Sequence, residues 1–216
     1  MPEFVVLHYT AMTPAAAAIA RLCDPAFEVS AHYVISEAGE VTQLVAEERR
    51  AGHAGAGSWR GRDDMNSRSI GIELVNDGAS PFAEPLLSAL QPCLAGILAR
   101  WSIPPWNVIG HSDMAPGRKI DPGRSFPWTR LEDKELALGP YALARVELDE
   151  LPPCETLFRA DALAAGYPDG PCETLLEAFR SRFAPQRSGP LSRRDMGDIA
   201  RLRTLMETFD KDRPQA

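Results

Sequence analysis

Two histidines and an aspartate stand where their side chains could meet around a metal ion. His8 ends an apolar run near the N-terminus, His111 follows a glycine after a short apolar segment, and Asp121 lies in the proline- and glycine-rich stretch beyond it. A catalytic zinc usually takes three protein ligands and leaves a fourth position open for water. Two imidazoles and one carboxylate suit zinc better than magnesium or calcium. These three residues therefore predict a zinc site.

Two charged residues could act on a substrate bound at such a site. Lys119 lies two residues before Asp121, and residues two apart in an extended segment point to the same side. Glu73 lies in an otherwise apolar segment, where a buried carboxylate is costly unless it is paired or faces a polar cleft. It is either the general base for a metal-activated water or a glutamate on the solvent face of an edge strand. Gly71, two residues earlier on the same face, leaves space above the sheet and favours the base.

The two remaining histidines have roles that the residues alone leave open. His32 precedes Tyr33 on a predicted strand, and His53 lies in a glycine-rich loop. For each of them, an ordinary structural role is as consistent with the sequence as a contact with substrate. Both are therefore candidate substrate-binding residues.

Alternating strands and helices would position these residues. Strands are predicted at residues 3–8, 31–36, 41–45, 69–76 and 107–110, with a hairpin turn at 37–40. Helices are predicted from Thr13 onward and at residues 81–101. The long loop at 49–69 is of a kind that is usually functional. Two histidines at strand ends in one α/β sheet can converge at the rim where such folds place their sites.

The sequence pattern changes after Trp128. Paired Gly-Pro and Pro-Pro residues suggest a connector, and three short helices are predicted at residues 155–165, 172–183 and 192–208. We therefore expect an α/β domain at residues 1–138, a linker at 139–153, a three-helix domain at 154–209 and a tail at 210–216.

Composition excludes several classes of protein. The 216 residues carry a net charge of −7, which argues against a nucleic-acid binder. No apolar run reaches the roughly 18 residues that a transmembrane helix requires. The start of the chain does not have the pattern of a signal peptide, so we expect a cytoplasmic protein, or a periplasmic or outer-membrane-associated one if the N-terminus is trimmed. Four widely spaced cysteines are poor metal candidates, and a bridge between Cys154 and Cys172 is the less favoured alternative to free thiols.

The chain resembles the zinc-dependent N-acetylmuramoyl-L-alanine amidases of the type-2 family. That family includes bacterial muropeptide amidases, T7-type lysozymes and peptidoglycan recognition proteins. The matching segments lie within roughly residues 4–130 and are 6–10, 30–35, 53–55, 69–74, 110–113 and 116–123. The resemblance implies a central mixed β-sheet flanked by helices. It also implies zinc ligation by His8, His111 and Asp121, with Glu73 as base and Lys119 stabilising the oxyanion. Tyr33 matches a position that is catalytic in some relatives and phenylalanine in others, and it is a third candidate substrate-binding residue.

The C-terminal part resembles a peptidoglycan-binding three-helix module, carried by residues 163–168 and 176–183. The module's common Phe-Gln pair reads Phe179-Arg180 here, so the helices could either target the enzyme to a polymer or only cover an apolar face. We favour targeting.

The expected activity is cleavage between N-acetylmuramic acid, or its anhydro form, and L-alanine in peptidoglycan or muropeptides. The alternatives are a non-catalytic peptidoglycan-binding protein on the same fold and a zinc endopeptidase acting on the stem peptide. The sequence does not decide between polymeric and soluble substrates, and it does not indicate an oligomeric state.

Overall fold

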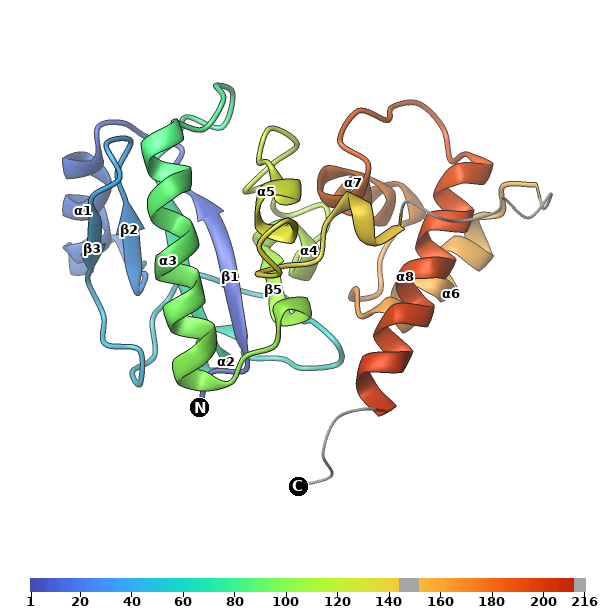
Figure 1. Ribbon diagram of the computed structural model, residues 1–216, viewed down its shortest axis with the longest axis horizontal. Coiled ribbons are helices and arrows are strands. Elements are labelled where there is room, and N and C mark those ends of the chain that lie inside the picture. The colour runs from blue at the N-terminus through green and yellow to red at the C-terminus, as the bar shows by residue number, and fades with distance from the viewer. Residues whose placement is uncertain (144–151, 212–216) are drawn as a thin grey trace.

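The computed structural model describes residues 1–143 and 152–211 and contains a five-stranded sheet flanked by helices (Figure 1). The strands, in the order β3-β2-β4-β1-β5 across the sheet, are β1 (Phe4–Tyr9), β2 (Tyr33–Ile35), β3 (Val41–Gln43), β4 (Ser69–Leu74) and β5 (Val108–Gly110). Strands β2 and β3 pair antiparallel, and the other neighbours are parallel. The predicted α/β class with a central mixed sheet is confirmed. Residues 144–151 of the predicted linker and 212–216 of the predicted tail lie outside the described residues.

The long helices follow the predicted boundaries closely. The α-helices within the described residues are α1 (Ala15–Cys23), α2 (Met65–Arg68), α3 (Glu84–Trp101), α4 (His111–Met114), α5 (Trp128–Glu132), α6 (Glu155–Ala165), α7 (Cys172–Phe183) and α8 (Arg193–Lys211). The 3-10 turns are η1 (Pro25–Phe27), η2 (Pro105–Asn107) and η3 (Pro140–Leu143). Helix α2 lies inside the segment predicted as loop, and α4 and α5 were not predicted. With four or five residues each, these three helices are too short to show a helical period.

One face of the sheet is closed by α3. Val5 and Leu7 of β1 and Ile70 and Ile72 of β4 are fully buried in a core that they share with the apolar side of this helix. Figure 1 shows α3 lying across the front of the strands. Since successive strand residues point to opposite faces, the alternate residues of β1 and β4 must face the other side of the sheet.

The polar residues of the strands lie on that other side. His8 on β1 is aligned with Glu73 on β4, and Leu7 is aligned with Gly110 on β5. His111 follows Gly110 as the first residue of α4, so the strand ends one residue before the histidine. The register therefore brings the three polar side chains to the carboxyl ends of three adjacent parallel strands, where α/β sheets commonly place their sites.

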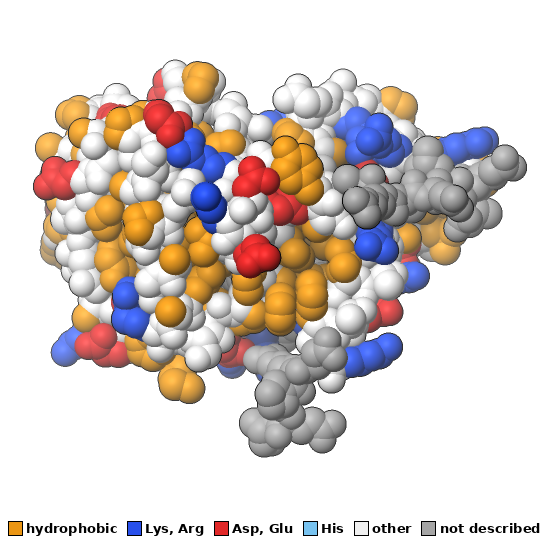
Figure 2. All heavy atoms as spheres, in the orientation of Figure 1, with side chains coloured by type: hydrophobic (Ala, Val, Ile, Leu, Met, Phe, Trp, Pro, Cys, Tyr) orange, Lys and Arg blue, Asp and Glu red, His pale blue; other side chains and the backbone are white. Residues whose placement is uncertain are grey.

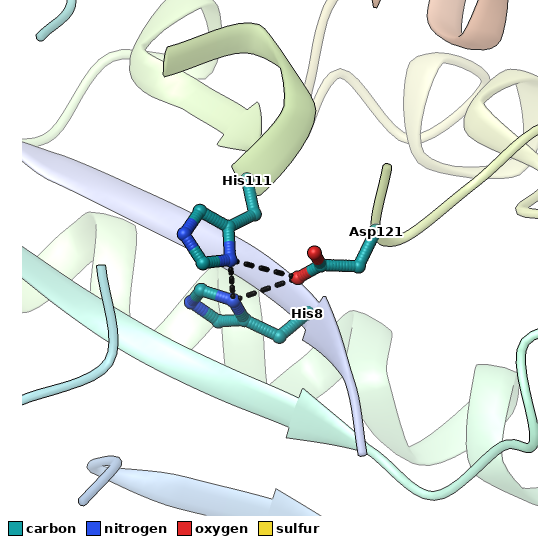
Figure 3. A group of neighbouring side chains, drawn as sticks. All are labelled: His8, His111 and Asp121. Atoms are coloured by element: carbon teal, nitrogen blue, oxygen red, sulfur yellow. Dashed lines mark hydrogen bonds and ion pairs between the residues drawn. The ribbon is translucent and has the colours of Figure 1, made fainter. Parts of the chain in front are cut away.

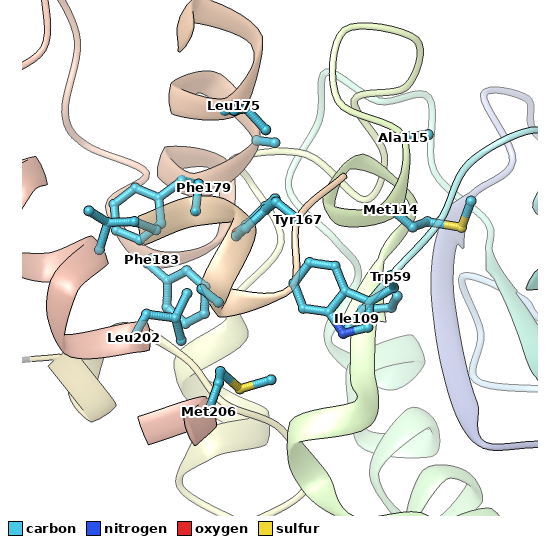
Figure 4. Close-up of a cluster of buried hydrophobic side chains, with 14 of the residues drawn as sticks. Trp59, Ile109, Met114, Ala115, Tyr167, Leu175, Phe179, Phe183, Leu202 and Met206 are labelled. Atoms are coloured by element: carbon cyan, nitrogen blue, oxygen red, sulfur yellow. The ribbon is translucent and has the colours of Figure 1, made fainter. Parts of the chain in front are cut away.

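The C-terminal helices share a buried hydrophobic cluster with the β5 edge of the sheet (Figure 4). Ile109 of β5 and Met114 of α4 belong to the same cluster as Phe158 of α6, Phe179 of α7 and Leu202 of α8. All five side chains have at most 2% of their surface exposed. The apolar sides of the three predicted helices thus pack on the sheet as well as on one another.

A buried ion pair also links α7 to α4. Arg182 donates from Nη1 to Asp113 Oδ2 at 2.9 Å, and both side chains are at most 3% exposed. The same guanidinium donates to the carbonyl oxygens of Val108 and Leu138 and lies over the ring of Trp128. Because Val108 begins the edge strand β5, α7 satisfies a backbone group of the sheet itself.

The surface is mixed in charge on the face that α3 covers. Figure 2 shows acidic and basic side chains interspersed with apolar ones there. Among the described helices, none has the length and apolar character needed to cross a bilayer. The four cysteines are free thiols.

Candidate active site

His8, His111 and Asp121 meet at one point (Figure 3). Nδ1 of His8 lies 2.9 Å from Nδ1 of His111 and 2.9 Å from Oδ2 of Asp121. Nδ1 of His111 lies 3.0 Å from the same carboxylate oxygen. The three buried side chains come from β1, from the start of α4 and from the loop beyond α4, and together they could hold a metal ion.

The loop that carries Asp121 is held close to the end of β5. The carbonyl oxygen of Asp121 accepts from the amide of Ser112 at 2.9 Å. A Cβ atom at Gly110 would lie 2.8 Å from the ring of Pro122, so only glycine allows the loop to approach this far. The Gly-His pair at the end of the strand therefore positions the carboxylate as well as the imidazole.

The electrostatics of this group favour metal-binding forms. Burial, and next the neighbouring His111, lower the pKa of His8 to about 4, against the opposing effect of Asp121. Burial alone would raise the pKa of Asp121, but its hydrogen bonds with His111 and His8 outweigh burial and lower the pKa. A neutral imidazole and an ionised carboxylate are the forms that bind metal ions.

Glu73 faces the same cavity with one of its two carboxyl oxygens unpaired among the described residues. Its Oε2 atom is buried and has no hydrogen bond within the described part of the chain. Burial and then the charge of Asp121 raise the pKa of Glu73 to about 8, although Lys119 acts in the opposite direction. A carboxylate with a pKa near neutrality is suited to general acid–base catalysis.

These residues line one cavity of about 540 Å³. Its walls include His8, His53, Glu73, His111, Lys119 and Asp121. Arg21 and Leu22 of α1 also line it, together with Met12 before that helix and Val29 after it. The structure therefore brings Lys119 to the cavity that holds the three possible metal ligands and Glu73. A second cavity of about 680 Å³ shares Tyr9, Lys119 and Ile120 with the first and extends to Glu173, Thr174 and Glu177 of α7.

The cavity also contains side chains that are absent from the sequence-based set, among them Tyr9, Arg21 and Arg118. Tyr9 lines both cavities, and Arg21 and Arg118 bring two cations to the first. Nη2 of Arg118 donates to the carbonyl oxygens of Ala54 and Ala56, which ties the loop of Asp121 to that of His53. Arg118 is adjacent to Lys119 and Tyr9 to His8, so proximity to the motifs could have indicated both. Arg21 lies in an alanine-rich helix without any such signal.

Two of the predicted substrate contacts lie elsewhere. Tyr33 is buried in the core on the α3 face, and its hydroxyl donates to Glu47 at 2.6 Å. His32 is fully buried, accepts from the amide of Gly71 and bonds the carbonyl of Arg49. Neither lines the cavity, so its walls give no support to the prediction that these two residues contact substrate. His53 does line it.

The part of the chain that carries these site residues matches a known protein family. The family model for N-acetylmuramoyl-L-alanine amidases matches residues 1–124. The chain is 38% identical over 156 residues to N-acetylmuramoyl-L-alanine amidase AmiD of Escherichia coli, covering 65% of this chain and 55% of AmiD. It thus spans about half the length of the curated relatives it matches.

Two solved structures are similar over nearly the whole chain. One is AmiD of E. coli in complex with anhydro-N-acetylmuramic acid-L-Ala-D-gamma-Glu-L-Lys, with a TM-score of 0.84 and 31% identity over 98% of this chain and 91% of that one. The other is AMPDH3 of Pseudomonas aeruginosa with anhydromuramic pentapeptide, with a TM-score of 0.81 and 32% identity over 94% and 92% of the two chains. Since the family model also covers more than half of the 216 residues, this protein belongs to the type-2 family of N-acetylmuramoyl-L-alanine amidases.

Proposed function

We propose that this protein is a zinc hydrolase that cleaves the amide bond between N-acetylmuramic acid, or its 1,6-anhydro form, and L-alanine. Its substrates would be peptidoglycan or the muropeptides derived from it. The observation that carries the proposal is the meeting of His8, His111 and Asp121 in one cavity with the buried Glu73 and with Lys119. The substrate bound to AmiD contains a bond of this type.

The donor set fits zinc. Ligand atoms at zinc-binding distances in a tetrahedral site lie about 3.4 Å apart, close to the 2.9–3.0 Å that separate the three donor atoms here. Three protein ligands with an open position is the usual arrangement of a catalytic zinc. When bound, the ion would polarise the scissile carbonyl and activate water.

The residues around the three metal-ligand atoms would carry out the proton transfer and stabilise the developing charge. Glu73 takes the proton of the attacking water and delivers it to the departing amine of L-alanine. Its Oε2 atom bonds to no other residue in the described part of the chain and is available for that proton. Lys119 offsets the negative charge that develops on the carbonyl oxygen. Arg21 and Arg118 make the cavity attractive to the carboxylates of a stem peptide, despite the net negative charge of the chain.

The two cavities suit a substrate with two arms. The scissile amide joins a sugar on its acyl side to a peptide on its amine side, and each arm needs its own binding surface. The cavities lie on either side of Lys119 and Ile120, and the second is walled by α7. Ile120 is 71% exposed between them, where it can contact bound substrate.

Mass spectrometry of reaction products tests this function directly. The purified chain is incubated with intact sacculi and, separately, with anhydromuropeptides. Free stem peptides that begin with L-alanine, together with peptide-free muramic residues, are the expected products. Fragments cut within the stem would instead identify an endopeptidase. Binding to sacculi without any release would identify a recognition protein.

Metal analysis tests the predicted ligands. Protein purified without chelators should contain about one zinc per chain. His111→Ala removes one of three ligands and should lose the metal and the activity, while circular dichroism should show that the fold remains. A folded His111→Ala that keeps full zinc content and turnover would contradict the assignment.

A further inference from the structure

The four histidines of the chain form one continuous row. The ring centroids of His111 and His8 are 4.5 Å apart, those of His8 and His53 are 5.1 Å apart, and those of His53 and His32 are 5.7 Å apart. Only the first two belong to the possible metal ligands. The row therefore begins at the possible metal ligands and continues behind them with His53 and His32. Groups behind a metal-binding histidine commonly hold its second ring nitrogen by a hydrogen bond.

The hydrogen bonds along the row fix where the protons lie. The hydroxyl of Ser69 donates to the carbonyl of Met65 at 2.5 Å, so its oxygen can accept from Nε2 of His53, 3.4 Å away. In a neutral imidazole one nitrogen donates and the other accepts. Nδ1 of His53 is then an acceptor, and Nε2 of His8, at 3.0 Å, donates to it. Nδ1 of His8 is left with a lone pair directed at the other donor atoms.

The second histidine ligand is held in the same way. Nε2 of His111 lies 2.8 Å from the carbonyl oxygen of Ala54, which can only accept. That bond leaves Nδ1 of His111 unprotonated and facing Asp121. Ala54 follows His53 in the chain, so adjacent residues of one loop fix the tautomers of both histidine ligands.

The ring of His53 has its position because of the strand beneath it. A Cβ atom at Gly71 would lie 2.4–2.6 Å from three atoms of this ring, so any other residue would displace it. The amide of Gly71 in turn donates to His32, whose ring packs edge-on against His53. The space that Gly71 leaves above the sheet is therefore filled by an imidazole.

We propose that His53 is a positioning residue that orients His8 for metal binding through its hydrogen bond, with Gly71 providing the room for its ring. This inference rests on the proposed metal site. It differs from the expectation of a substrate contact, because a substrate contact would change KM and leave metal affinity unaltered. Loss of such a supporting hydrogen bond typically weakens metal binding about 10–100-fold.

The test is a zinc competition titration of the full chain against a chromophoric chelator. His53→Phe keeps a ring and removes the acceptor, and it should raise the Kd for zinc about 10–100-fold. His53→Gln keeps an acceptor and should bind zinc more tightly than His53→Phe. Gly71→Ala, which does not touch the donor atoms, should weaken binding by crowding the ring. Val29→Ala, in the cavity wall and away from this row, should leave the Kd unchanged.

Circular dichroism establishes that each variant is folded before titration. If His53→Phe does not fold, the comparison of Gly71→Ala with Val29→Ala is the test. Gly71→Ala should then have the higher Kd for zinc. A folded His53→Phe or Gly71→Ala with the wild-type Kd would overturn the inference while leaving the zinc site in place. A wild-type chain that binds no zinc would overturn the proposed metal site together with this inference.

Discussion

Glu73→Gln should lower kcat by about 10²–10⁴-fold, the usual cost of removing a general base. Glutamine has nearly the same shape as glutamate but cannot accept a proton. The variant should retain zinc, because Glu73 is outside the group of possible metal ligands. It should also be at least as stable as the wild type, since burial disfavours the ionised form of Glu73 and glutamine carries no charge. Turnover is measured on a purified anhydromuropeptide, with metal content and the melting temperature measured on the same samples.

The control is Glu40→Gln, which removes a carboxylate from the exposed hairpin between β2 and β3. It should change neither turnover nor metal content. Wild-type turnover in Glu73→Gln would show that another group is the base. A loss of zinc in this variant would instead indicate that Glu73 supports the metal site rather than the proton transfer.

The sequence predicts the part of the site that depends on strand ends. His8 and His111 could be placed at one edge because each follows an apolar run and parallel strands end at a common rim. Glu73 could be singled out because a carboxylate interrupts an apolar strand. These inferences need only the local pattern and the layer architecture, and the register of β1 with β4 and β5 agrees with them.

The supporting contacts require knowledge of which face each residue occupies. His32 and Tyr33 are neighbours on one extended segment, so they must point to opposite faces, and the pattern could have excluded one of them from the cavity. That His53 lies over Gly71 could not be predicted, because the long loop that carries His53 has no periodicity to fix its path. Three-dimensional proximity alone reveals that contact.

The packing of the C-terminal helices against the sheet is a feature that the sequence did not favour. The sequence shows a proline-bearing connector before them and thus favours a separate targeting domain. The structure shows a hydrophobic cluster common to β5, α6, α7 and α8. A buried ion pair also joins Arg182 of α7 to Asp113 of α4. The two residues are 69 positions apart in the sequence, so no local pattern can indicate this contact. We propose that these helices fold as one unit with the sheet.

Arg182→Met should therefore destabilise the whole protein. It leaves the Asp113 carboxylate buried without its cation and removes the donors to the carbonyl oxygens of Val108 and Leu138. Breaking a buried ion pair by removing one partner typically costs about 3–5 kcal/mol, a large part of the roughly 5–15 kcal/mol that stabilises a domain. Since Asp113 belongs to α4, which begins with His111, the same change should reduce zinc binding and activity on soluble muropeptides.

Denaturant unfolding at neutral pH measures the effect, with Arg159→Met as the matched control. Arg159 pairs with Asp169 on the surface of the same helical part, where both side chains are 44% or more exposed. An exposed pair of this kind contributes about 0–1 kcal/mol, so this variant should unfold almost as the wild type does. Adding Asp113→Asn to Arg182→Met should recover part of the loss, because no unpaired charge then remains buried. If the helices were instead a tethered targeting module, Arg182→Met would leave activity on soluble muropeptides intact and weaken only the binding of sacculi.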